Sequence, residues 1–139
     1  MPQKMHSTAK LVRDLRIVVD DGRAHSLCLD LPPELGTNMG PTALELGVMS
    51  FSGCVATIFA LTAKKMRVPL KDLEVKLEAT KSEDVGTVTE ASFEIVVKAE
   101  ATEDRIRRIL RLTLENCPVG KLFEKAGVKT NYNLRIEKE

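Results

Sequence analysis

The sequence predicts a fold that combines β-hairpins with one long uncharged helix and two shorter helices. Residues 11–19 and 24–31 are rich in Val, Leu and Ile and are separated by Asp20, Asp21 and Gly22, a pattern typical of a β-hairpin. Residues 73–79 alternate apolar and polar side chains, which indicates a one-sided strand. Residues 46–63 carry no charge, which favours a helix that is buried on all sides.

Length and composition restrict the classes of protein that this chain can represent. The 139 residues, 43% of them hydrophobic, predict a single domain over residues 1–139. The net charge is +1, no Trp is present, and Lys and Arg are spread along the chain, so neither a nucleic-acid nor a membrane partner is expected. The first ten residues lack the apolar segment of a secretory signal, and we therefore expect a cytoplasmic protein.

The cysteine content favours reactive or buried thiols over disulfides or metal binding. Three cysteines are too few for a disulfide framework, and the odd number leaves at least one unpaired thiol in a monomer. Together with His6 and His25 they could supply four zinc ligands, but no CxxC or HxxxH motif is present. We therefore expect no metal.

The first hairpin leads into a loop that is a candidate rim for a site. His25 and Cys28 lie on opposite faces of the second strand, where Cys28 is expected to be a half-buried packing thiol and His25 a surface residue. Residues 32–41 are rich in Pro and Gly and follow neither the alternation of a strand nor the periodicity of a helix. Functional residues are frequent in such loops.

The long helix is expected over residues 42–67 and contains Cys54. Its uncharged part reaches the minimum length of a membrane span. Its serines, threonines and two glycines dilute the hydrophobicity, and charged segments surround it. A helix that forms the buried centre of a domain or dimer is the simpler interpretation.

A second hairpin is expected from residues 73–79 and 88–99, followed by a helix that Thr102 caps. Glu103 and Asp104 in its first turn suit the helix dipole. Its apolar residues follow three-and-four spacing, which places the last of them, Cys117, on the face that packs on the core. The residues of this stripe are Ile106, Ile109, Leu110, Thr113, Leu114 and Cys117.

Cys117 also precedes Pro118, which disfavours helical geometry at Cys117 and suits the first position of a new helix. That helix is expected over residues 118–126 with Gly127 as its stop, and a last strand over 131–136. Cys117 would be its N-cap, where free backbone N–H groups and the dipole favour the reactive thiolate. The alternative is that Cys117 only fills the end of the apolar stripe, and spacing leaves both open.

Four motifs follow one another along nearly the whole chain. They are Gly40-Pro41-Thr42-Ala43-Leu44-Glu45-Leu46, Ser52-Gly53-Cys54, the segment 64–75 and Glu115-Asn116-Cys117-Pro118-Val119. Together they resemble the osmotically inducible protein C and organic hydroperoxide resistance (OsmC/Ohr) family, in its OsmC-like branch. The resemblance implies an α+β fold in which hairpins and an antiparallel sheet pack on a long buried central helix, within an intertwined homodimer.

The resemblance further implies a thiol peroxidase for organic hydroperoxides. The residue matching Cys54 attacks the hydroperoxide and becomes a sulfenic acid, which condenses with the residue matching Cys117 to an intramolecular disulfide. An external dithiol or lipoyl-type reductant then restores both thiols, and neither a metal nor a flavin cofactor is implied. The rival hypotheses are a binding protein for a small apolar ligand and a redox sensor, each of the same fold with little peroxidase turnover.

The family also implies an arginine that stabilises the Cys54 thiolate, because burial alone opposes thiolate formation. Alignment of residues 14–18 with the family's early strand makes Arg16 the matching residue. The glutamate that holds this arginine stands ten residues before the first cysteine, where this chain has Leu44. Three roles are open for Glu45: a neutral structural feature of the OsmC-like branch, a helix-start carboxylate, or a residue that orients Arg16. Leu44 at the glutamate position puts efficient peroxidase activity in doubt.

Overall fold

The computed structural model describes residues Met1–Lys138, and the chain divides into two compact units. The first unit is Met1–Gly47, and the second begins at Val48. The single domain expected from the chain length stays a prediction.

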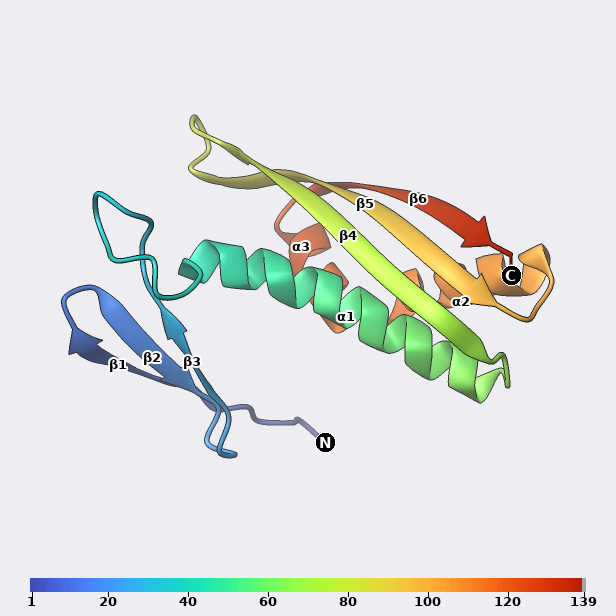
Figure 1. Ribbon diagram of the computed structural model, residues 1–139, viewed down its shortest axis with the longest axis horizontal. Coiled ribbons are helices and arrows are strands. Elements are labelled where there is room, and N and C mark those ends of the chain that lie inside the picture. The colour runs from blue at the N-terminus through green and yellow to red at the C-terminus, as the bar shows by residue number, and fades with distance from the viewer. Residues whose placement is uncertain (139) are drawn as a thin grey trace. The chain divides into compact units, whose positions relative to one another are not determined.

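The first unit contains a three-stranded antiparallel sheet in the order β1-β2-β3 (Figure 1). Its strands are β1 (Thr8–Arg13), β2 (Arg16–Asp20) and β3 (Ser26–Leu29). The sequence predicted one strand over residues 11–19, which is wrong, because the chain reverses between β1 and β2. Asp14 has a φ of 50° at this turn, a conformation that the short polar side chain of Asp tolerates better than most residues.

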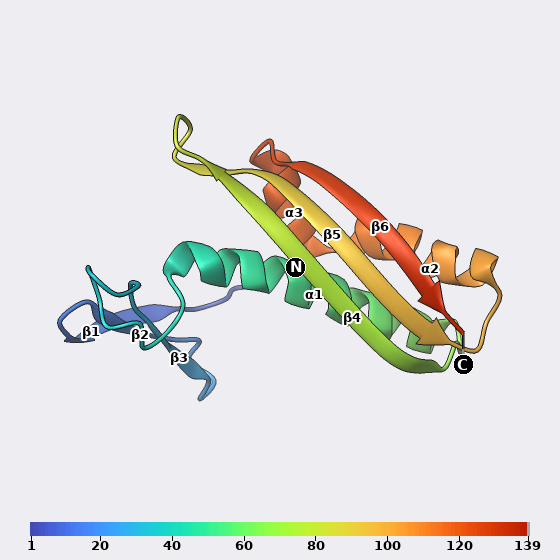
Figure 2. The same ribbon diagram turned by 45° about the horizontal axis from the view of Figure 1, so that its top comes forward.

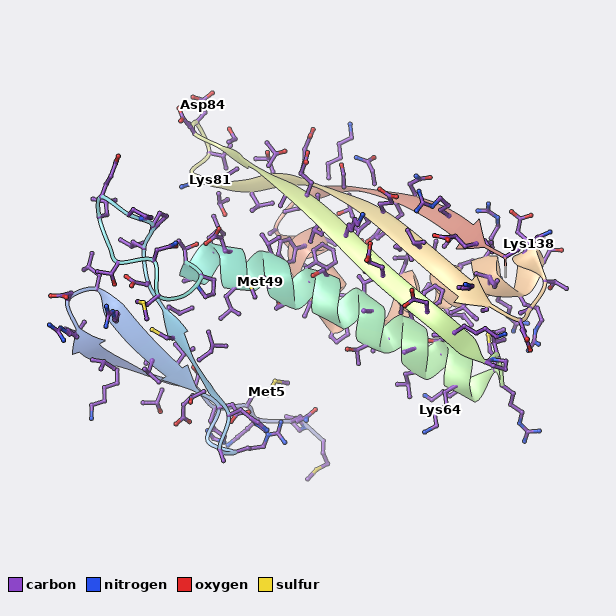
Figure 3. All side chains as sticks on the ribbon, in the orientation of Figure 1. Met5, Met49, Lys64, Lys81, Asp84 and Lys138 are labelled. Carbon is purple, nitrogen blue, oxygen red and sulfur yellow. The ribbon has the colours of Figure 1, made fainter. Side chains whose placement is uncertain are left out.

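The second unit contains a sheet in the order β4-β5-β6. Its strands are β4 (Leu70–Ser82), β5 (Thr87–Ala99) and β6 (Lys129–Glu137). The β4–β5 hairpin is antiparallel as predicted, and Lys81 and Asp84 mark its end in Figure 3. The antiparallel sheet that the resemblance implies is present in β4 and β5, whereas β6 pairs with β5 in parallel. The helices between β5 and β6 return the chain to the starting end of the sheet, as a parallel pair requires.

Three helices cover one face of this sheet (Figures 1 and 2). They are α1 (Ala43–Lys65), α2 (Glu103–Asn116) and α3 (Pro118–Lys125). The sheet face is built by alternate residues of β5, including Phe93, Ile95 and Val97, which are buried. Ile106 and Ile109 of α2 join the same core, so the predicted apolar stripe of this helix is confirmed.

Local signals in the sequence set the ends of α2 and α3. The Thr102 hydroxyl accepts a hydrogen bond from the Arg105 N–H at 3.3 Å, which confirms the predicted N-cap. Pro118 occupies the first turn of α3, and Cys117 is its N-cap. Gly127, with a φ of 81°, follows α3 and supports its predicted stop.

Helix α1 was expected at the buried centre of a domain or dimer, and within one chain it is not buried on all sides. Phe51, Val55, Phe59 and Ala63 are buried at four-residue spacing, whereas Met49, labelled in Figure 3, is 54% exposed. Within one chain α1 therefore buries a single face. Its length and composition would also allow it to cross a membrane, a property that it shares with core helices of globular proteins.

Truncation of Phe59 should destabilise the protein strongly, because its side chain is fully buried at 0% exposure. We expect Phe59→Ala to lower the free energy of unfolding, measured by urea denaturation, by about 3–5 kcal/mol. Val85→Ala, in the exposed β4–β5 turn, is the control and should change it by less than about 0.5 kcal/mol. Equal effects of the two substitutions would contradict the packing of α1 on this core.

Candidate functional site

The structure brings Cys54 and Cys117 into direct contact in the second unit. The Cys117 Sγ–H donates a hydrogen bond to the Cys54 Sγ, and the two sulfur atoms are 3.1 Å apart. Both residues are free thiols, with Cys54 half-buried and Cys117 buried. Two cysteines that are 63 positions apart in the sequence therefore form one site that can close into a disulfide without large movement of either helix.

Cys117 reaches this position because one helix ends at it and another begins. Its backbone is extended, with φ and ψ of −79° and 108°, which agrees with the restriction that Pro118 imposes on the preceding residue. The Gly120 N–H donates to the Cys117 Sγ at 3.3 Å, so the side chain caps α3. The apolar stripe of α2 and this cap together direct the thiol into the core.

A cluster of aromatic rings fixes α1 beside α3 and the sheet. The Phe51 ring of α1 stacks on Phe123 of α3 with a centroid distance of 4.4 Å and meets Phe93 of β5 edge-on at 4.8 Å. Phe93 in turn stacks on Tyr132 of β6 at 4.9 Å. Phe51 lies one helical turn before Cys54, so these contacts set the depth at which the Cys54 thiol meets Cys117.

The electrostatics of Cys117 oppose the thiolate that its N-cap position was expected to favour, while its role as a reactive thiol stays a prediction. Burial, followed by the hydrogen bond to Cys54, raises the pKa of Cys117 to about 11. The hydrogen bond from Gly120 lowers this pKa but is outweighed. The N-cap position is thus confirmed, while the thiolate that it was expected to favour is not, because desolvation in the core exceeds the effect of the helix terminus.

Cys117 also borders a pocket of about 310 Å³ within the second unit. Burial, with the nearby Cys117 and Glu124 contributing their charges, raises the pKa of Tyr132 to about 12, so its phenol stays protonated. The pocket has a mixed polar and apolar lining. Its other lining residues are Leu114, Gly120, Glu124, Val128, Thr130 and Tyr132.

Arg16 lies in the first unit and is held by two residues of the β3–α1 loop. Its Nε donates to the Thr37 hydroxyl at 3.0 Å and lies 3.8 Å from the Asp30 carboxylate. The Thr37 hydroxyl donates to Asp30 at 2.7 Å. The site role that the resemblance implies for Arg16 stays a prediction.

Glu45 forms a capping box at the start of α1 and makes no recorded contact with Arg16 in the described residues. Its carboxylate accepts from the Thr42 N–H at 2.9 Å, and the Thr42 hydroxyl accepts from the Glu45 N–H at 3.1 Å. The alternative that the sequence left open, a helix-start carboxylate, therefore describes its contacts. Leu44 supplies no polar group and is partly exposed.

Asp30 and Thr37 are the polar residues that the sequence analysis missed. Asp30 is buried, with its carboxylate accepting from the N–H groups of Leu31 and Met39. The available signal for Asp30 was a carboxylate inside the expected apolar strand 24–31, two residues before two prolines. Thr37 lies in the loop 32–41 that was identified as a candidate rim. A buried carboxylate needs hydrogen-bond donors, and here the loop itself provides them.

Within Met1–Lys138, no group of three or more His, Cys, Asp or Glu side chains is placed to hold a metal ion. Cys28 is half-buried and donates to the Leu29 carbonyl at 3.6 Å. The expectation that the protein uses no cofactor stays a prediction.

Residues 36–133 match the family model described as OsmC-like protein. The fold is similar to that of an OsmC-like protein from Mycoplasma pneumoniae, with a TM-score of 0.86 and 18% identity over 98% of this chain and 99% of the other.

Organic hydroperoxide resistance proteins share the fold at lower similarity. The protein from Legionella pneumophila has a TM-score of 0.68 and 14% identity, with 96% of this chain and 97% of the other covered. The protein from Bacillus subtilis has a TM-score of 0.61 and 16% identity, with 97% and 98% covered. No curated protein matches the sequence.

The Cys117 thiol should resist alkylation in the folded protein. Burial is the main cause that raises the Cys117 pKa, and it remains when Cys54 is replaced. A variant with Cys28→Ser and Cys54→Ser should therefore react slowly with iodoacetamide at pH 8, and the midpoint of its pH dependence should lie above that of the unfolded chain. The same variant in urea, titrating near the ordinary thiol value, is the control. A native midpoint below that of the unfolded chain would mean that the helix terminus outweighs burial.

Asp30 should make stability depend on pH in the acid range. The hydrogen bond from Thr37 is the main cause that lowers the Asp30 pKa from 3.8 to about 2, against the opposing effect of burial. The stabilisation is therefore complete above the unfolded value of 3.8 and is lost as the pH falls toward 2. The stability difference between wild type and Asp30→Asn, measured by urea unfolding, should shrink across this interval, and a constant difference would contradict the assignment.

Proposed function

Because this chain belongs to the OsmC-like protein family, we propose that it is a thiol peroxidase that reduces organic hydroperoxides. One observation carries the proposal: the Cys117 thiol donates to the Cys54 sulfur across 3.1 Å. A nucleophilic thiolate with a second thiol in contact is the arrangement that a two-cysteine redox cycle requires. Two of the solved structures with this fold bear the name organic hydroperoxide resistance protein, which agrees with this substrate class.

In the first step the Cys54 thiolate attacks the terminal oxygen of the hydroperoxide. The O–O bond breaks, sulfur is oxidised to sulfenic acid, and the alkoxide leaves and is protonated to the alcohol. Cys54 suits the nucleophilic role because its sulfur is the acceptor in the thiol pair and is half-buried. Cys117, whose pKa is raised to about 11, is the neutral donor and is poorly suited to the first attack.

In the second step Cys117 condenses with the oxidised Cys54. The S–S bond forms while the S–O bond breaks, and the hydroxyl group leaves as water with the proton from the Cys117 thiol. The sulfur contact in the reduced protein supports this pairing, because only short motions of two side chains are required. An external dithiol or lipoyl group then donates two electrons and two protons, restoring both thiols and becoming a disulfide itself.

Arg16 is the proposed cation that stabilises the Cys54 thiolate. It is partly accessible, with 30% of its side chain exposed, and its guanidinium is permanently charged. A thiolate in an apolar environment needs such compensation. This role rests on the family resemblance, and Glu45 is proposed to act only indirectly, by capping the helix that carries Cys54.

A cytoplasmic homodimer is the proposed state of the protein. In support, α1 buries one face in its own chain and exposes the apolar residues Met49 and Leu61 on others. A second copy of the chain would remove such a surface from water. The reducing cytoplasm would keep both thiols available for the next cycle.

Leu44 favours one rival, a redox sensor of the same fold that oxidises readily and turns over slowly. This residue stands where the family resemblance implies a glutamate that holds the arginine. The third hypothesis, a binder of small apolar ligands, has less support, because the pocket beside Cys117 includes Glu124, Thr130 and Tyr132. A sensor would form the disulfide once without efficient turnover, whereas a binder would keep its thiols reduced.

Steady-state reduction of cumene hydroperoxide with a dithiol tests the proposal directly. We expect Cys54→Ser to lower turnover by more than about a thousandfold, because the nucleophile is lost. Cys117→Ser should instead accumulate a sulfenic acid that dimedone traps, because the resolving thiol is absent. The wild type should lose about two free thiols per chain to one equivalent of hydroperoxide.

Cys28→Ser is the matched control, because Cys28 lies in the first unit and is bonded to its own strand. Its turnover should stay within about twofold of wild type. Absence of turnover in the reduced wild type would reject the peroxidase. Thiol loss in that case would support the sensor, and retention of both thiols would support the binder.

A further inference from the structure

The guanidinium of Arg16 is hydrogen-bonded through Nε, which leaves the N–H groups of its two terminal nitrogens available to a further acceptor. A guanidinium has five N–H donors, one on Nε and the others on the two terminal nitrogens. Here Nε–H is bonded to Thr37 at 3.0 Å and lies 3.8 Å from Asp30. The terminal N–H groups have no recorded partner in the part of the chain that the structure describes, Met1–Lys138.

The hydrogen bonds around Thr37 have a single possible direction. Arginine can only donate, and an ionised carboxylate can only accept. Asp30 is ionised at neutral pH, since its pKa is lowered to about 2. The one hydroxyl proton of Thr37 therefore points to Asp30 at 2.7 Å, and its lone pair receives the Arg16 Nε–H.

The Asp30 carboxylate, which accepts the hydrogen bond from Thr37, is itself held in place by the surrounding loop. Its side chain is 1% exposed, and the N–H groups of Leu31 and Met39 donate to it at 2.8 and 3.1 Å. Gly36 comes so close that a Cβ atom there would lie 2.5 Å from the Asp30 Oδ1. The carboxylate therefore has little freedom to move, and Thr37 is anchored by it.

We infer that Thr37 is a positioning residue for Arg16, with its hydroxyl fixing the guanidinium by Nε so that the terminal N–H groups are presented to an anion. In the family resemblance a glutamate at position 44 holds the arginine, and this chain has Leu44 there. The Thr37 hydroxyl, anchored on buried Asp30, thus takes over the task of orienting Arg16. The inference rests on the proposed function in one respect, namely that the anion is the Cys54 thiolate.

A purely structural role of Thr37 makes a different prediction, because the loop is closed by other bonds. The Asp30 N–H donates to the Pro41 carbonyl at 3.1 Å, and the Asn38 N–H donates to the Leu31 carbonyl at 3.0 Å. Neither bond uses the Thr37 side chain. Thr37→Val keeps the branched shape and replaces the hydroxyl with a methyl group, whereas Thr37→Ser keeps the hydroxyl and loses the methyl group.

The test measures the pH dependence of Cys54 alkylation by iodoacetamide in the full chain carrying Cys28→Ser and Cys117→Ser. Thr37→Val should move the midpoint to higher pH and slow the reaction at pH 7 by about tenfold, the size expected for loss of one hydrogen bond to a charged group. Thr37→Ser should stay within about twofold of the parent. Arg16→Met should slow the reaction at least as much, and adding Thr37→Val to it should change nothing further.

Thr8→Val in β1 is the matched control, because it makes the same substitution in the same unit at an exposed threonine, and circular dichroism checks that every variant is folded. The inference is overturned if Thr37→Val matches the parent, if Thr37→Ser is as slow as Thr37→Val, or if Arg16→Met has no effect. Hydroperoxide turnover of the wild type is measured in parallel. Its absence would count against the peroxidase, while the alkylation rates still decide the role of Thr37.

Discussion

The packing of Phe51 is the contact on which the thiol pair depends. Cys54 and Cys117 come from different helices, and no covalent or metal link is recorded between these helices in the described residues. Their separation is set by rings: Phe51 stacks on Phe123 and meets Phe93 edge-on. Aromatic pairs of this kind add about 0.5–1.5 kcal/mol each beyond burial and restrict orientation, so the two sulfur atoms are held at contact by the hydrophobic core itself.

Burial in the same core gives the two thiols different chemistry. The helix N-terminus and the Gly120 N–H favour a thiolate at Cys117, yet the pKa of Cys117 is raised, because desolvation is the larger effect. Cys117 therefore remains a neutral donor, and Cys54 is the acceptor. In the proposed cycle this difference has two consequences. Cys54 is the only nucleophile of the pair in the first step, and the Cys117 thiol keeps the proton with which the sulfenic acid hydroxyl of Cys54 leaves as water in the second step.

Features coded by neighbouring residues were predictable from the sequence, and features that depend on distant contacts were not. Thr102, Pro118 and Gly127 fixed the helix ends as expected, because capping acts over a few positions. The reversal at Asp14 was missed, since it uses neither Gly nor Pro. The pairing direction of β6, the sulfur contact and the pKa of Cys117 all depend on how helices and sheet pack, which no local pattern reports.

The same distinction explains the contacts of Arg16. Sequence position suggested Glu45 as its partner, but a carboxylate in the first turn of a helix lies close to free backbone N–H groups, and Glu45 binds one of them. Asp30 is available to Arg16 only because the loop folds around it. A hydroxyl between Asp30 and Arg16 has a further consequence. A carboxylate bound to the terminal N–H groups would compete with any anion for those donors, whereas Thr37 uses Nε and leaves them free.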